Sequence, residues 1–141
     1  MFFMQCGDIL PEIGIGNIKL GMSRNDVEKI MFETIVQCLP EFYILQGEDI
    51  KVWVNKSEDC VTQIMVFGAF EGKLMKEFGI GSHLPDIEQK LNETAKEECY
   101  VYCFESLRGI CFELEELEED WDDIDWFKSK SKISFISVFK E

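Results

Sequence analysis

The sequence predicts an α+β fold: one domain, residues 1–141, with an antiparallel sheet of about five to seven strands and two or three helices. The first observation is helical spacing after a capping signal at Ser23. The second is a series of alternating apolar runs from Phe42 to Phe67. Third, no linker rich in Pro, Gly or Ser divides the chain, and 46% apolar residues suffice for one buried core.

The first predicted helix follows a short strand and a turn at Gly21. Ser23 and Asp26 match a capping box, in which a hydroxyl and a carboxylate satisfy N–H groups at the helix start. Apolar side chains then recur at helical spacing as far as Ile35. We therefore predict a helix from Ser23 to Val36.

Three consecutive antiparallel strands are predicted next, in "EFYILQG", "DIKVWVN" and "CVTQIMVFG", because β-branched and aromatic residues alternate between short turns. Val52 and Val54 share one face of the middle strand, and Trp53 lies on the other. Apolar residues on both faces indicate a sheet that is covered on both sides at this point.

A second helix is predicted from Pro85 to Asn92, since proline favours a first helical turn. An ungapped offset of 60 residues aligns Gly21 with Gly81 and Val27 with Ile87. This offset suggests a weak tandem repeat of a helix-then-strands unit, and chance similarity of helix starts is the alternative. "CYVYCFESLRGICFELE" indicates a hairpin that turns near Ser106 to Gly109, and "KISFISVFK" a last strand.

The six cysteines predict reduced thiols, because the N-terminus lacks the basic region of a secretion signal. Cytoplasmic localisation is therefore expected. Cys99 and Cys103 have the wrong spacing for a zinc knuckle, and His83 is the only histidine, so neither metal nor cofactor is predicted.

The net charge of −14 indicates which classes of partner the protein can bind. An acidic chain repels phosphate backbones and anionic membranes, so we expect no nucleic-acid or membrane partner. A basic protein fits the charge better. Catalysis is not expected either, since a histidine-dependent system would have to use His83, which lies at a predicted helix start. We expect a protein that is not an enzyme.

The run from Glu113 to Asp125 holds nine carboxylates and no basic residue. Leu114, Leu117, Trp121 and Ile124 form a narrow helical stripe, with Trp126 nearly opposite among the acids. The run is either a solvated helix face or a surface for a cationic partner. We favour binding, because neighbouring like charges about 4 Å apart repel by about 1 kcal/mol per pair even in water. The predicted partner-binding residues are Glu118, Glu119, Asp120, Asp122, Asp123, Asp125 and Trp126.

"GNIKLGMSRNDVEKI" (Gly16 to Ile30) and "YVYCFESLRGICFELEELEE" (Tyr100 to Glu119) resemble the small immunity proteins of bacterial toxin–immunity systems, including those of contact-dependent growth inhibition. The resemblance implies a cytosolic, non-enzymatic toxin inhibitor that binds and blocks one cognate basic toxin domain, often a nuclease. "LGMSRNDV" also resembles the helix-plus-strand repeats of outer-membrane assembly lipoproteins and inhibitor domains.

Two other functions remain open from sequence. One is a cytosolic acidic adaptor domain whose partner is unrelated to toxins. The other is a small-molecule binding domain or enzyme with Trp53 in its pocket. The oligomeric state, the toxin's activity and the mode of inhibition do not follow from the sequence.

Overall fold

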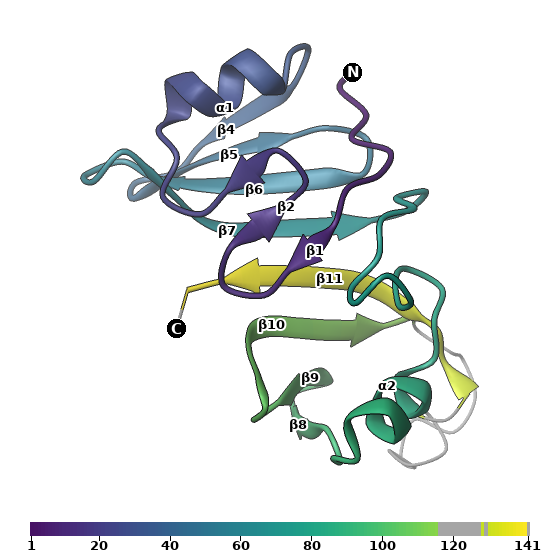
Figure 1. Cartoon of the computed structure of the whole chain (residues 1–141). Coiled ribbons are helices and arrows are strands. Elements are labelled where there is room, and N and C mark those ends of the chain that lie inside the picture. The colour runs from purple at the N-terminus through teal and green to yellow at the C-terminus, as the bar shows by residue number, and fades with distance from the viewer. Residues whose placement is uncertain (116–127, 129, 141) are drawn as a thin grey trace.

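The computed structural model of this chain describes residues 1–115, 128 and 130–140, and these residues form mostly β-structure (Figure 1). They contain eleven strands in two antiparallel sheets, of three and eight strands, and two helices of seven and eight residues. The predicted α+β class with five to seven strands is therefore wrong. The extra strands are short or charged, so alternation of apolar residues does not reveal them.

The small sheet is a three-stranded meander near the N-terminus. Its strands have two residues each: β1 Ile9–Leu10, β2 Gly14–Ile15 and β3 Ile18–Lys19. Although it is small, it contributes fully buried side chains at Ile15 and Ile18 to the core.

Helix α1, Arg24–Ile30, begins as predicted, with Ser23 Oγ accepting a hydrogen bond from the N–H of Asp26 at 3.2 Å. It ends six residues before the predicted Val36. Glu33 has a positive φ of 56°, which a continuing helix excludes. The β-branched residues that follow favour an extended chain, and β4, Ile35–Cys38, starts here instead.

The large sheet is built from two four-stranded meanders joined at their last strands. Its first meander is β4, β5 Phe42–Gln46, β6 Ile50–Asn55 and β7 Cys60–Phe67. Helix α2, Leu84–Leu91, then leads into β8 Lys96–Glu98, β9 Val101–Phe104, β10 Leu107–Leu114 and β11 Ile133–Phe139. The spatial order β4-β5-β6-β7-β11-β10-β9-β8 places β7 beside β11 at the centre.

Each meander is preceded by a helix, and the two helices begin 60 residues apart. Their N-cap residues are Ser23 and His83. The preceding turns contain Gly21 and Gly81, at similar positive φ angles of 89° and 92°. The chain therefore repeats a helix-plus-four-strands unit, and the offset alignment of the sequence connects equivalent helix starts.

The core lies on one face of the large sheet. The central strands alternate between buried and partly exposed residues, as in β6, where Val52 and Val54 are buried and Trp53 is not. One cluster joins these valines to Val27 of α1 and Ile87 of α2. Figure 1 shows both helices and the small sheet in front of the large sheet. The predicted coverage on both sides is therefore wrong for the described elements.

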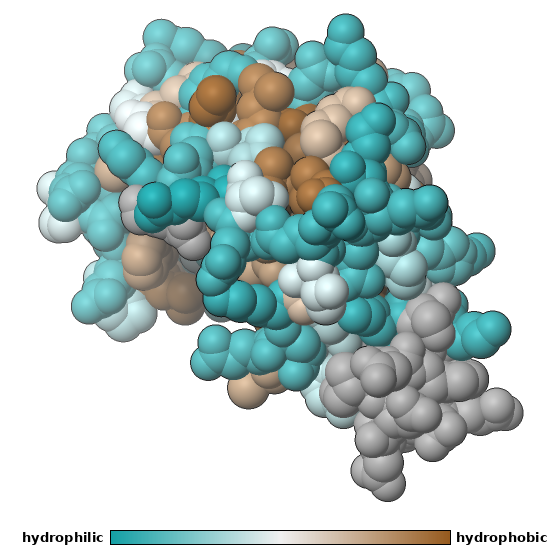
Figure 2. All heavy atoms as spheres, turned by 60° about the horizontal axis from the view of Figure 1, so that its bottom comes forward, coloured by the Kyte–Doolittle hydropathy of each residue, from teal (hydrophilic) through white to brown (hydrophobic). Residues whose placement is uncertain are grey.

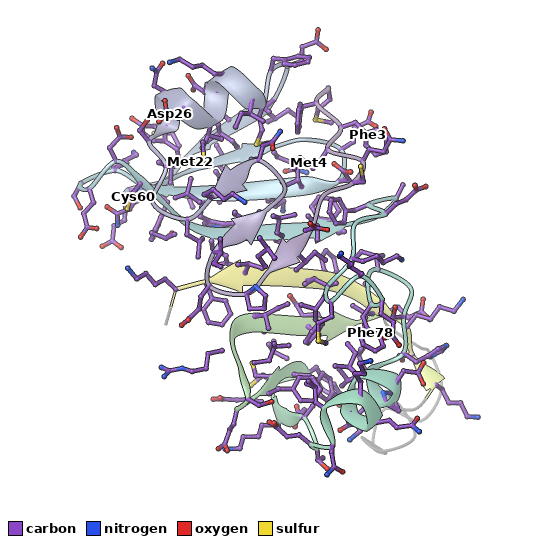
Figure 3. All side chains as sticks on the ribbon, viewed as in Figure 1. Phe3, Met4, Met22, Asp26, Cys60 and Phe78 are labelled. Atoms are coloured by element: carbon purple, nitrogen blue, oxygen red, sulfur yellow. The ribbon has the colours of Figure 1, made fainter. Side chains whose placement is uncertain are left out.

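The N-terminal segment is fixed to this structure by a buried carboxylate. Asp49 accepts hydrogen bonds from the N–H groups of Met4 and Gln5, each at 2.8 Å. Met4 packs against the core, whereas Phe3 is exposed and points outward (Figure 3). Phe2 donates its N–H to the carbonyl of Glu33 at 3.0 Å, so the segment also supports the approach to β4.

Candidate functional site: an uncovered sheet face

The opposite face of the large sheet carries side chains that none of the described helices or small strands covers. Side chains on neighbouring strands share a face when they are paired in register, as Ile44, Trp53 and Gln63 are. We call this the open face. On β5, β6, β7 and β11 its residues are Phe42, Ile44, Gln46, Lys51, Trp53, Asn55, Cys60, Gln63, Met65, Phe67, Phe135, Ser137 and Phe139, and the neighbouring strand β10 adds Cys111 and Glu113.

Contacts among these residues show a packed surface layer. The rings of Phe67 and Phe135 lie 5.8 Å apart, centroid to centroid, at an interplanar angle of 44°. The Gln63 amide donates to the Ser137 hydroxyl at 3.3 Å. Ile44 is only 9% exposed although it does not belong to the core cluster, so the face shields its own interior. These contacts order the side chains of the open face relative to one another.

The composition of the open face differs from that of the chain. Charged residues make up 30% of the sequence, yet Lys51 and Glu113 are the only charged residues among the open-face side chains named above. Aromatic side chains, a methionine and amides take their place, with Phe135 37% exposed. The cores of protein–protein interfaces have this character, because charge is costly to desolvate whereas aromatic and methionine side chains give large contact areas.

Hydrophobic side chains are also exposed elsewhere. In the view of Figure 2 they lie among polar residues over the upper part of the molecule. The large exposed ones of the described chain are Met1, Phe3, Leu10, Ile13, Phe32, Ile35, Val36, Met75, Tyr100 and Phe135. The largest group of exposed hydrophobic residues that are close in sequence lies at the edge strand β4 and just before it, and consists of Phe32, Ile35 and Val36.

The two edges of the large sheet differ in charge. The β8 edge consists of Lys96, Glu97 and Glu98, all exposed, and Lys96 forms an ion pair with Glu105. Strand β4 is exposed along its whole length and carries no charged side chain. Charged edge strands discourage pairing with other chains, so only the β8 edge has this protection.

Two thiols lie side by side at the margin of the open face. Cys111 is next to Cys103 on the neighbouring strand, and burial, reinforced by Cys103 and Glu113, raises the pKa of Cys111 to about 12. A thiol with this pKa holds almost no thiolate at neutral pH and is a poor nucleophile. All six cysteines are free in the structure.

The only histidine borders a cavity of about 620 Å³ beside α2. Its backbone forms the N-cap of α2, and its Nδ1 is buried without a hydrogen-bond partner among the described residues. Across the cavity, Lys90 pairs with Glu77 at 3.5 Å. The neighbouring Ser82 hydroxyl accepts the Gly79 N–H at 3.0 Å, which occupies it in a turn. Phe78, labelled in Figure 3, forms one wall.

Within the described residues no group of three or more His, Cys, Asp or Glu side chains could hold a metal ion. Among the same residues, none of the helices combines the length and the apolar character needed to cross a bilayer.

The seven predicted partner-binding residues, Glu118, Glu119, Asp120, Asp122, Asp123, Asp125 and Trp126, lie outside the described residues. Sequence reasoning missed the open face. The sequence contained a signal for this face. Trp53, Met65 and Phe135 alternate with core residues and so lie on the opposite side of the sheet, where three large apolar side chains would not be expected to face water. Comparisons with protein-family models, curated proteins and solved structures found no match to this chain.

Proposed function

We propose that this protein is a cytosolic immunity protein that binds and neutralises a cationic toxin domain. The observation that carries the proposal is the open face: a charge-poor, aromatic surface on a chain with a net charge of −14. The apolar centre supplies short-range contact area, and the acidic charge of the whole chain favours approach of a basic protein.

The site chemistry favours binding over catalysis. The cavity beside His83 brings its imidazole close to an ion pair and a hydroxyl that already accepts a backbone hydrogen bond. The buried thiol Cys111 is held in its protonated form by its raised pKa. Inhibition by occupation of a partner's surface requires neither group.

An acidic adaptor domain is the second candidate, and the open face supports it equally, because a binding surface does not identify the partner's activity. The resemblance of Gly16 to Ile30 and Tyr100 to Glu119 to immunity proteins favours the toxin inhibitor.

Co-expression separates the two functions. Immunity genes normally follow the gene of their toxin, so the probe is the C-terminal domain of the protein encoded immediately upstream. We expect that domain to arrest growth when produced alone and to be harmless together with this protein. Growth arrest in both cases, with both proteins present in soluble form, would contradict the immunity proposal. A stable complex with a harmless domain would favour the adaptor.

A further inference from the structure

The edge strand β4 presents unpaired backbone groups. At the end of the β4–β5 hairpin, the N–H of Leu39 donates to the carbonyl of Phe42 at 2.8 Å. Hydrogen-bonded and non-hydrogen-bonded pairs alternate along an antiparallel ladder. The next hydrogen-bonded pair is therefore Gln37 of β4 with Ile44 of β5. The backbone N–H and C=O groups of Val36 and Cys38 therefore point away from the sheet.

The side chains around this edge favour a docked strand. Phe32 and Ile35 are exposed by 64% and 61%, and Val36 by 42%. Ile35 and Gln37 continue the rows of the open face, through their pairing with Gln46 and Ile44. A strand added to β4 would extend that face without interruption.

Charge indicates what kind of strand would dock. Glu41 is exposed and follows β4 in the sequence, whereas Glu33, which precedes β4, lies 3.6 Å from the N-terminal ammonium. Lys56 Nζ lies 3.0 Å from Cys38 Sγ. Because both signs of charge lie at the ends of β4, the net charge of −14 is what favours a basic extended segment. A second copy of this chain is a poor occupant, because pairing β4 with β4 would bring together two chains of net charge −14.

We propose that β4 receives an extended, basic segment of the partner protein, which adds a ninth strand to the large sheet. The inference rests on the proposed function and specifies how the partner engages. Backbone hydrogen bonds to Val36 and Cys38 provide the pairing, and contacts with Phe32 and Ile35 select apolar side chains in the segment.

Two substitutions at one position separate backbone pairing from side-chain contact. Val36→Pro removes the outward N–H, and proline is tolerated at an edge position whose N–H faces solvent. Val36→Thr keeps the N–H and the β-branched shape. The probe is again the C-terminal domain encoded immediately upstream. We expect Val36→Pro to weaken its binding by about 10-fold or more, and Val36→Thr to bind nearly as the parent does.

Amide hydrogen exchange of the unmodified chain gives a readout that does not depend on the variants. The amides of Val36 and Cys38 should exchange fast in the free protein and become protected in the complex. Equal binding by Val36→Pro together with unprotected amides would overturn the strand-addition inference and leave the proposed function standing. Failure of the parent chain to bind the domain would overturn both. A dimer of the free chain that Val36→Pro disperses would show that a second copy occupies the edge, which also overturns the inference.

Discussion

Removal of the Asp49 carboxylate tests how the N-terminal segment is held. Asp49 is 1% exposed, and its two oxygens accept the N–H groups of Met4 and Gln5 at 2.8 Å. In Asp49→Ala both N–H groups lose their acceptor, and Asp49→Asn leaves one acceptor oxygen. Each hydrogen bond to a charged group contributes about 1.5–3 kcal/mol. We therefore expect Asp49→Ala to lower the free energy of unfolding by about 3–5 kcal/mol and Asp49→Asn by about half as much.

Urea denaturation followed by tryptophan fluorescence measures both losses. Asp26→Ala is the matched control, because Asp26 is an exposed carboxylate on helix α1 (Figure 3). Its Oδ1 lies 3.9 Å from Nζ of Lys29. An exposed ion pair of this kind contributes at most about 1 kcal/mol. If Asp49→Ala is no more costly than Asp26→Ala, the two backbone hydrogen bonds do not hold the segment and the reasoning fails.

Three further predictions concern turns, thiols and charge. At Gly109, where φ is 77°, an alanine Cβ would lie 2.6 Å from the Phe139 carbonyl oxygen, whereas a Cβ at Gly21, where φ is 89°, would meet open space. Gly109→Ala should therefore lower the urea midpoint of unfolding far more than Gly21→Ala does. Cys111 should react with a thiol reagent at pH 8 roughly a thousandfold more slowly than an ordinary thiol, because its thiolate forms only near its pKa of about 12. Its reaction rate should increase as the pH rises. Labelling kinetics followed by mass spectrometry measure these rates, and equal rates for all six thiols would contradict the prediction. Replacing Asp122, Asp123 and Asp125 together by Asn should slow association with the upstream-encoded domain and make the association rate less dependent on salt. If stopped-flow association rates are unchanged, the acidic run is a solvated face.

The strands of the sheet centre could be predicted because apolar residues alternate along most of their length. In β6 every second side chain enters the core, and β7 follows the same period from Ile64 onward, after an irregularity between Val61 and Gln63. The start of α1 was also predictable, because Ser23 caps it through a local hydrogen bond.

The missed elements depend on information that alternation does not contain. Ile35 falls at helical spacing from Met31 by coincidence, while the run Thr34-Ile35-Val36 carries the strand preference. Strand β8 has three charged residues and hence no apolar period. The open face follows from which side the helices and the small sheet cover, and that choice is made by long-range packing among residues such as Val27, Val52 and Ile87.

Binding through the open face is the central claim, and truncation of its aromatic side chains tests it most directly. Trp53→Ala and Phe135→Ala should each raise the dissociation constant for the upstream-encoded domain by about 30-fold or more, since a buried interface aromatic contributes about 2 kcal/mol or more. Ile13→Ala, which truncates an equally apolar side chain that is 55% exposed outside this face, should leave the constant unchanged. Titration calorimetry on variants with parent-like urea midpoints gives these values. If Trp53→Ala and Phe135→Ala bind as tightly as the parent does, the partner docks elsewhere and the claim is wrong.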